Sequence, residues 1–545
     1  MAADAGSAPV PSPLRQTFET VRVLVRAGVL SPGRPDRIVR QLKALRAWGP
    51  TIAGGYAAAN ERTPGAVAII DEDGDSTFAD MNQRGKQLAQ DLWRHGVREG
   101  TRVGLLCRNH SGFVQAMIAC GRLGADVVLL NTGLATAQIT AAAADNEVGA
   151  LIADAEFEEV HSGLPPEVPR FAAWGDPSSA PKVPWRPAEV QGEGSAPPAR
   201  PGRLVVLTSG TTGAPKGARR PTPKGPQDAA SVLSRIPLRS SDRILVSAPI
   251  FHTWGLAGVQ LGMSMRATLV TRRLFGPEDV LRTVQEQRCT ALFAVPVMLR
   301  RIMDLPRSVR EKYDTSSLRV VACSGSAMSP KLITDFMDTF GDVLYNLYGS
   351  TEVSWATIAG PQDMRRAPTT AGRPPLGTRV AILDPDGNEL PAGSEGSIFV
   401  GNHMLFDGYT NGRSKKTVLG LMETGDRGHV DGHGLLHVAG RDDDMIVSGG
   451  ENVFPRPVEE AVVAMPGVRE VAVKGVPDEE FGQRFAAYVV PHDGAVVDPN
   501  AVRLQVRTEL GRYSVPRDVV VLPELPRNAT GKVVKRQLPD STPEE

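Results

Sequence analysis

One segment of the chain combines residue types that bind phosphate. An apolar run at 203–207 leads directly into Thr-Ser-Gly-Thr-Thr-Gly-Ala-Pro-Lys-Gly at 208–217. Glycines let backbone N–H groups approach a polyphosphate, while the hydroxyls and the lysine supply donors and positive charge. The spacing differs from that of a Walker loop, and Pro215 disfavours the helix that such a loop requires. A plain hairpin turn rich in Gly and Thr is the alternative, which the length of the pattern disfavours.

This loop and five later segments resemble, in the same order, the signature segments of adenylate-forming enzymes. That superfamily includes acyl-CoA synthetases, firefly-luciferase-like enzymes and peptide-synthetase adenylation domains. The later segments are 249–255 (PIFHTWG), 345–352 (YNLYGSTE), 424–426 (TGD) with 440–441 (GR), 443–455 (DDMIVSGGENVFP) and 526–532 (PRNATGK). Among members, the chain looks most like bacterial fatty-acid:CoA ligases, supported by 109–113 (NHSGF) and 295–299 (VPVML).

The resemblance implies both the reaction and its co-substrates. ATP with Mg²⁺ would convert a carboxylic acid into its acyl-AMP with release of pyrophosphate, and coenzyme A would then take the acyl group as a thioester. Because ATP repels an incoming carboxylate, the site must first neutralise its negative charge. Segments 323–327 and 345–349 would hold the adenine between them. The residues assigned to ATP and AMP are Thr208, Ser209, Gly210, Thr211, Thr212, Gly213, Lys216, Ser324, Gly325, Ser326, Tyr345, Asn346, Tyr348, Gly349, Ser350, Asp426 and Arg441.

The resemblance also implies catalytic, acyl-binding and CoA-binding residues. The catalytic set is Lys532, Thr351, Glu352 and His252. Mg²⁺ is assigned to Glu352 and Thr208, because an oxygen-rich site with few carboxylates suits magnesium. The acyl pocket is assigned to His252, Thr253, Trp254 and Gly255. The hinge and the CoA path are assigned to Asp443, Ser448, Gly449, Gly450 and Glu451.

Several of these residues also have ordinary structural interpretations. Asp426 lies in a Thr-Gly-Asp-Arg-Gly sequence that is typical of a turn, and His252 is alternatively a buried structural histidine. Trp254 either gates an acyl tunnel or packs in the core. Pro457 stands where the family usually carries a glutamate, which the first turn of a helix tolerates because that N–H has no intrahelical partner. Glu459 keeps the second acidic position.

Three histidines, His429, His433 and His437, recur at intervals of four residues. On a helix this spacing would favour a metal site. Intervening glycines argue against a helix, and they favour a hairpin with Asp431 near its turn.

Apolar and amphipathic segments predict an α/β fold with more than one domain. We expect strands at 66–70, 102–107 and 126–130, helices at 77–92 and 113–123, and therefore parallel strands in layers. The Pro-rich stretch 163–202 is interpreted as a surface excursion. At 545 residues the chain is longer than a single hydrophobic core usually accommodates. We predict an N-terminal extension at 1–50, a large multi-sheet adenylation domain at 51–442 and a small mobile α+β domain at 443–545.

The stretch 14–48 places apolar and basic residues at helical spacing. A helical pair packed on the main domain is the favoured interpretation, and a peripheral membrane contact is the alternative. The net charge of zero gives no indication of nucleic-acid binding, and four separated cysteines are typical of reduced thiols. We expect a cytoplasmic protein. A peripheral position at the inner face of the membrane and a homodimer are further possibilities that the sequence does not decide.

The predicted acyl-pocket segment lacks an acidic residue, which bears on the class of acid that is the substrate. Amino-acid-activating relatives commonly place an aspartate there, and segment 251–254 has no acid, which disfavours an amino-acid substrate. The resemblance to bacterial fatty-acid:CoA ligases implies a medium- or long-chain fatty acid. An aryl or short-chain acid:CoA ligase, an acyl-AMP ligase that loads a carrier protein, and a nucleotide-binding regulator without activity are the alternatives.

Overall fold

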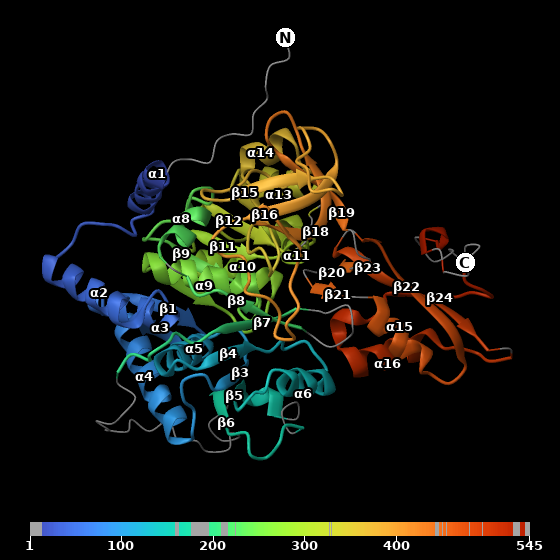
Figure 1. The fold of residues 1–545 in the computed structure, drawn as a ribbon, viewed down its shortest axis with the longest axis horizontal. Coiled ribbons are helices and arrows are strands. Elements are labelled where there is room, and N and C mark those ends of the chain that lie inside the picture. Colours follow the sequence, from blue (N-terminus) through green and yellow to red (C-terminus); the bar gives the residue numbers. More distant parts are fainter. Residues whose placement is uncertain are drawn as a thin grey trace, which may run out of the picture.

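The computed structural model describes most of the chain. The described residues are 13–158, 163–175, 196–208, 216–223, 225–325, 328, 330–441, 446–448, 451–453, 455–478, 480–492, 494–526, 533 and 535–539. They form two large sheets, a smaller sheet and a C-terminal unit with a sheet of its own, which lies at one side of the large domain (Figure 1).

An eight-stranded sheet forms the centre of the large domain. Its order is β14 (Thr357–Ala359), β13 (Leu344–Tyr348), β12 (Val320–Ser324), β11 (Ala291–Ala294), β9 (Arg243–Val246), β10 (Thr268–Thr271), β1 (Val67–Asp71) and β2 (Gly74–Thr77). Strands from β13 to β1 are parallel, and the two edge strands are antiparallel. The helices α10 (Pro277–Gln287), α11 (Pro296–Met303) and α13 (Pro330–Phe340) pack on one face.

A six-stranded sheet shares a hydrophobic core with the first one. Its order is β6 (Arg170–Trp174), β5 (Ala150–Asp154), β3 (Arg102–Leu106), β4 (Asp126–Leu129), β7 (Leu204–Thr208) and β8 (Lys216–Arg220). Helices α3 (Ile52–Arg62), α4 (Phe78–Arg94), α5 (Ser111–Leu123) and α9 (Thr253–Met265) supply the core shared by the two sheets. α6 (Thr136–Asp145) covers the other face.

The remaining strands form two smaller sheets. One contains β15 (Arg379–Leu383), β16 (Gly396–Gly401), β18 (Leu421–Val430), β17 (Thr417–Val418) and β19 (Leu436–Arg441). The C-terminal sheet contains β21 (Glu451–Val453), β20 (Ile446–Ser448), β23 (Gly482–Pro491), β22 (Val468–Asp478) and β24 (Asp518–Val521), with α15 (Pro455–Val463) and α16 (Pro499–Leu510) packed against it. Short helices α8 (Gln227–Leu233), α12 (Arg307–Arg310) and α14 (Pro361–Arg366) complete the large domain.

The predicted α/β layering with parallel strands is confirmed, and each predicted element exists. β1, α4, β3, α5 and β4 match the expected strands and helices to within two residues at each end. The interpretation of 163–202 was incomplete, because β6 lies within it and pairs in parallel with β5. Its short Arg-Phe-Ala-Ala-Trp run carries little periodic signal, so only the sheet beside it identifies the strand. The predicted domain boundaries stay predictions.

The two N-terminal helices, α1 (Pro13–Arg26) and α2 (Pro35–Trp48), pack on the large domain as the favoured interpretation expected. Their connecting loop is held by two arginines: Arg62 donates to the carbonyls of Ser31 and Pro32, and Arg266 donates to the Gly28 carbonyl. Among the described residues, every helix is too short or too polar to cross a bilayer.

Pro457 lies in the first turn of α15, which begins at Pro455, so its missing N–H costs no helical hydrogen bond. Glu459 on the same helix accepts a hydrogen bond from the Val473 N–H at 2.8 Å and lies 3.0 Å from Lys535. The retained acidic position thus links α15 to β22 and to the segment that follows the predicted catalytic lysine.

Candidate active site

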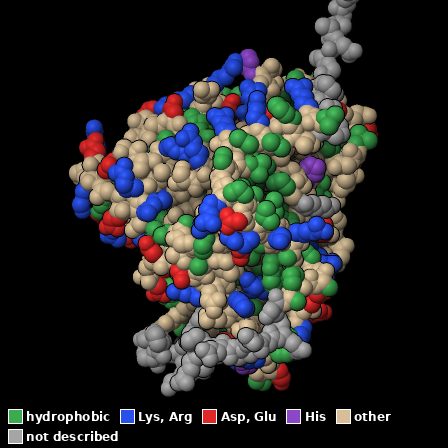
Figure 2. Space-filling model, turned by 90° about the vertical axis from the view of Figure 1, so that its left-hand side faces the viewer, with side chains coloured by type: hydrophobic (Ala, Val, Ile, Leu, Met, Phe, Trp, Pro, Cys, Tyr) green, Lys and Arg blue, Asp and Glu red, His purple; other side chains and the backbone are tan. Residues whose placement is uncertain are grey.

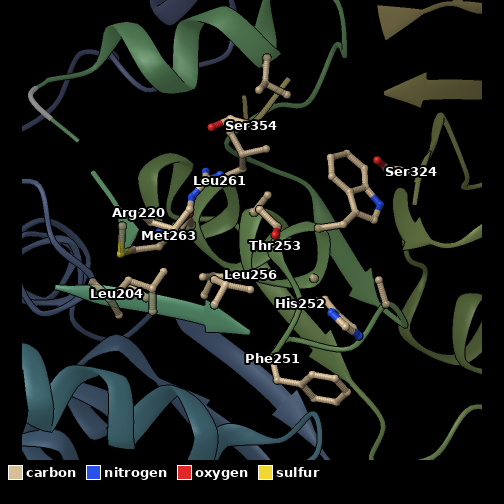
Figure 3. A pocket seen from close by; sticks show the side chains of 18 of the residues that line it. Leu204, Arg220, Phe251, His252, Thr253, Leu256, Leu261, Met263, Ser324 and Ser354 are labelled. Atoms are coloured by element: carbon tan, nitrogen blue, oxygen red, sulfur yellow. The ribbon is translucent and has the colours of Figure 1, made fainter. Parts of the chain in front are cut away.

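A cavity of about 1910 Å³ lies at the carboxyl edge of the eight-stranded sheet and extends toward the C-terminal unit. Parallel strands bring their carboxyl ends to the same edge. Ser324 ends β12, residues 349–351 follow β13, and His252 and Thr253 begin α9 after β9. Figure 3 shows Ser324, His252 and Thr253 around one pocket. The predicted nucleotide and acyl segments therefore meet.

Two hydroxyls mark the point where these segments meet. Thr253 Oγ1 lies 3.4 Å from Thr351 Oγ1, although the residues are 98 positions apart in the chain. Thr351 follows a tight turn that needs Gly349, because a Cβ there would lie 2.4 Å from the Ser354 carbonyl oxygen. A carboxylate bound at Thr253 would thus lie beside the residue assigned to the α-phosphate.

Glu352 is held by residues from distant segments. Its Oε1 accepts a hydrogen bond of 2.6 Å from the Tyr409 hydroxyl. Arg220 lies nearby and donates from Nη1 to the Thr351 carbonyl at 2.8 Å. Burial lowers the pKa of Arg220 to about 10, with the Glu352 carboxylate acting in the opposite direction. The guanidinium therefore stays protonated at neutral pH.

The proposed ribose-binding pair lies on the hairpin of β18 and β19. Asp426 and Arg441 are direct cross-strand partners, which places their Cα atoms within about 5.5 Å. Asp426 is buried and accepts a hydrogen bond of 2.6 Å from the Tyr348 hydroxyl. β13 and β18 are thereby joined at the site, and Asp426 is more than the turn residue that its local sequence indicates.

The same hairpin contains the three spaced histidines, and the predicted turn at Asp431 is confirmed. His429 and His437 face each other across the two strands with ring centroids 5.0 Å apart. Asp431 accepts from the N–H groups of His433 and Leu435. These contacts explain the histidine spacing by strand pairing.

The segments predicted to hold the adenine lie where β12 and β13 end at the cavity edge. Gly325 has φ 116°, a conformation that side-chain-bearing residues rarely adopt. Asn346, next along β13 to Tyr345, has a buried Oδ1 that accepts no hydrogen bond within the described part of the chain. Such an acceptor fits the amino group of an adenine. Ser350 Oγ accepts from the Glu352 N–H at 3.3 Å and orders the turn.

The acyl-pocket residues form the start of α9. His252 is the N-cap residue, and its ring lies 4.5 Å from that of Phe251. Trp254 is buried, donates to the Ala294 carbonyl at 3.1 Å and packs on Phe293. These contacts favour the packing interpretation over a gate. Gly255 has no room for a Cβ, which would lie 2.2 Å from the Pro249 carbonyl oxygen.

Many of the predicted site residues lie outside the described residues. These are Ser209, Gly210, Thr211, Thr212, Gly213, Ser326, Asp443, Gly449, Gly450 and Lys532. For Thr208, Lys216, Arg441, Ser448 and Glu451 the structure describes the backbone. Thr208 and Lys216 are paired at the ends of the antiparallel strands β7 and β8, so the predicted phosphate-binding segment connects two paired strands. A hairpin connection and a phosphate loop are therefore compatible here.

The C-terminal unit presents one particular side to the cavity. Phe481, Arg484 and Tyr513 line it, and Glu480 forms an ion pair of 3.2 Å with Arg301 of the large domain. The described residues that flank Lys532, Pro526 and Val533, do not line this cavity.

Two residues of the site escaped the prediction from sequence. Arg220 follows the predicted phosphate-binding segment, and the basic pair at 219–220, one residue beyond it, was an available signal. Tyr409 gave no signal, because its partner Glu352 is 57 positions away and nothing in the local sequence links them.

We expect Asp426→Asn to raise the KM for ATP by roughly tenfold, because a buried amide replaces a carboxylate acceptor in a paired network. Steady-state kinetics with varied ATP would measure this. Asp431→Asn is the matched control, since Asp431 accepts hydrogen bonds in the turn of the same hairpin. Equal effects of the two substitutions would contradict a role of Asp426 in nucleotide binding.

Two family models match the chain. The model described as AMP-binding enzyme matches residues 56–410, and the model described as AMP-binding enzyme C-terminal domain matches residues 457–532.

Curated relatives cover most of the chain. A feruloyl-CoA synthase from Amycolatopsis sp. is 34% identical over 488 residues, covering 87% of this chain and 96% of the relative. An indoleacetate–CoA ligase from Aromatoleum aromaticum is 32% identical and covers 87% and 94%. The long-chain-fatty-acid–CoA ligase FadD13 from Mycobacterium tuberculosis is 31% identical and covers 85% and 92%.

Solved structures match over a similar extent. The amide bond synthetase McbA from Marinactinospora thermotolerans has a TM-score of 0.81 at 28% identity, covering 89% of this chain and 98% of McbA. The o-succinylbenzoate CoA synthetase MenE from Bacillus subtilis matches at 27% identity in two states. A double mutant bound to its product analogue OSB-NCoA has a TM-score of 0.77, covering 89% and 98%. The complex with the acyl-adenylate intermediate has a TM-score of 0.63, covering 90% and 99%.

Proposed function

Because the chain belongs to the AMP-binding enzyme family, we propose that it is a carboxylate:CoA ligase that activates its acid as an acyl-adenylate. The observation that carries this proposal is the approach of Thr253 to Thr351 in one cavity. A carboxylate at the first residue lies within reach of an α-phosphate at the second. That juxtaposition is what in-line attack on the α-phosphorus requires.

In the first half-reaction the site lowers the repulsion between carboxylate and nucleotide. The hydroxyls and Lys216 of the phosphate-binding segment would hold the leaving pyrophosphate, and Thr351 would donate to the α-phosphate. Lys532 would stabilise the charge that develops between acid and nucleotide. Mg²⁺ held by Glu352 and Thr208 would supply further positive charge to the phosphate oxygens. Tyr409 fixes the orientation of the Glu352 carboxylate.

In the second half-reaction the CoA thiol attacks the acyl carbonyl and AMP leaves. The described arrangement suits this step, because the flanks of Lys532 do not line the cavity while Phe481 and Tyr513 do. The TM-score is higher against MenE bound to a product analogue than against MenE bound to the acyl-adenylate. This difference supports the assignment of the described arrangement to thioester formation. A rotation at the Asp443 hinge would exchange the two arrangements.

For the acid, we propose a fatty acid of medium or long chain. The cavity continues from Thr253 along α9, past Leu256 and Met263, to Leu24 of α1 and Leu45 of α2. We call this part the apolar branch. An unbranched hydrocarbon fits a long apolar channel, and burial of each methylene adds about 0.8 kcal/mol to binding. FadD13, a relative named for long-chain fatty acids, supports the proposal.

An aryl acid is the second candidate. It is favoured by the names of the feruloyl-CoA and indoleacetate relatives. An aromatic acid would occupy only the part of the cavity near Thr253.

To distinguish a fatty-acid substrate from an aryl substrate, we would supply ATP with acetate, benzoate, ferulate, hexanoate or palmitate. AMP release would be followed with and without CoA. A kcat/KM that rises with aliphatic chain length supports a fatty acid. A preference for ferulate or benzoate would overturn that choice, and acyl transfer only to a supplied carrier protein would overturn the CoA ligase.

A further inference from the structure

The apolar branch reaches the surface between the N-terminal helices and the large domain. Thr17, Val21 and Leu24 of α1 and Leu45 of α2 line it, together with Met263 of α9. These helices lie outside the matched family model, which begins at residue 56. The far end of the cavity is therefore built by a part of the chain that the family model does not contain.

The outer side of the same helices is apolar and exposed. Leu14, Phe18 and Val25 lie on one face of α1, as helical spacing requires, and Val39 lies on α2. Phe18 is 67% exposed and Val25 is 56% exposed. We call the three residues of α1 the outer stripe; none of them lines the cavity. Exposed apolar side chains gathered in this way mark an interaction surface.

The outer stripe lies in strongly basic surroundings. Residues 13–48 contain eight Lys or Arg residues and two acidic residues, a net charge of +6, whereas the whole chain has a net charge of zero. Arg22, Arg26, Lys43 and Arg46 are exposed. Figure 2, in which the side of the molecule carrying α1 and α2 faces the viewer, shows hydrophobic side chains in a band with Lys and Arg beside it.

We propose that α1 and α2 dock on an anionic lipid surface and admit a fatty acid from it into the apolar branch, which rests on the proposed function. Basic residues attract anionic headgroups, and the outer stripe inserts among the acyl chains. A membrane-borne fatty acid carries its carboxylate at headgroup level. The carboxylate therefore enters first and reaches Thr253, while the tail follows into the apolar branch without turning round.

The test uses the full chain and vesicles of equal parts phosphatidylcholine and phosphatidylglycerol, with pure phosphatidylcholine for comparison. Phe18→Asp with Val25→Asp removes the outer stripe, and Val496→Asp with Leu504→Asp is the matched control at exposed apolar sites of the C-terminal unit. Lys43→Glu with Arg46→Glu reverses charge at the helices, and Arg307→Glu with Lys331→Glu does so elsewhere on the surface. Co-sedimentation gives the partition constant, and thermal unfolding checks each fold.

We expect the parent to bind the anionic vesicles, and both helix variants to lower the partition constant by about tenfold or more. Their controls should bind as the parent does. Turnover of palmitate supplied in vesicles should fall with binding, while turnover of soluble hexanoate stays unchanged.

Equal vesicle binding by the parent and the folded helix variants would overturn the proposal. A second outcome would also overturn it: the parent is a dimer that does not bind vesicles, and the outer-stripe substitutions dissociate that dimer. A second copy of the chain would then be the partner. Absence of acid-dependent AMP release with both acids would overturn the proposed fatty-acid substrate separately, since vesicle binding is measured without substrate.

Discussion

Replacing Lys532 with alanine should slow acyl-adenylate formation by about 10²–10³-fold, the typical cost of removing a group that stabilises transition-state charge. The ammonium would act between two anions, the acid and the nucleotide, so no neighbouring hydroxyl can replace it. Pyrophosphate exchange with ATP and palmitate measures this half-reaction. Thioester formation from supplied palmitoyl-AMP and CoA should stay near the parent rate, because the described residues that flank Lys532 do not line the cavity in that arrangement.

Lys535→Ala is the matched control for this experiment. Lys535 belongs to the same C-terminal segment but forms an ion pair with Glu459. Its loss should leave pyrophosphate exchange within about twofold of the parent, because the pair is partly exposed and neither residue lines the cavity. An equal loss in both half-reactions for Lys532→Ala would indicate misfolding of the C-terminal unit. An unchanged exchange rate would show that Lys532 has no part in adenylation.

Glu352→Gln should lower the rate of acyl-adenylate formation by about 10²-fold and raise the Mg²⁺ concentration needed for half-maximal rate. The amide keeps the size of the side chain and an oxygen for Tyr409, but it loses the negative charge that a hard divalent cation requires. Pyrophosphate exchange over a Mg²⁺ titration measures both quantities.

Tyr409→Phe gives the graded control for Glu352. It removes the 2.6 Å hydrogen bond and keeps the charge, so its cost should be that of one hydrogen bond, roughly threefold to tenfold. An unchanged Mg²⁺ dependence in Glu352→Gln would exclude this carboxylate as the metal ligand. The nearby Arg220 would then become the main charged group in the site, with Glu352 as its counter-ion.

Arg220 adds a positive charge to the site that its anionic ligands would meet. It is anchored on the Thr351 carbonyl and is among the residues that line the cavity (Figure 3). Its pKa of about 10 leaves it charged throughout the neutral range. The site therefore has a fixed cation where the nucleotide and acyl regions meet, in addition to the lysines that the motifs predicted.

The sequence by itself predicted the family and the α/β layering, because both depend on residue types at short spacing. The Gly- and Thr-rich segment, the Tyr-Gly-Ser-Thr-Glu segment and their order predicted the family and the α/β layering, and both are confirmed. Local periodicity was also sufficient for α4 and α5, since α4 buries one face and α5 buries nearly all of its side chains. The N-terminal helices were predicted from apolar and basic residues at helical spacing.

Only the tertiary structure decided which residues meet. The pairs Thr253–Thr351, Glu352–Tyr409 and Asp426–Tyr348 join segments that are 98, 57 and 78 positions apart. No spacing in the chain encodes these contacts, because they arise where parallel strands end at one edge and a separate hairpin folds over it. For the same reason, the sequence indicated a basic amphipathic N-terminus, but only the packing of α1 and α2 placed it at the end of the cavity.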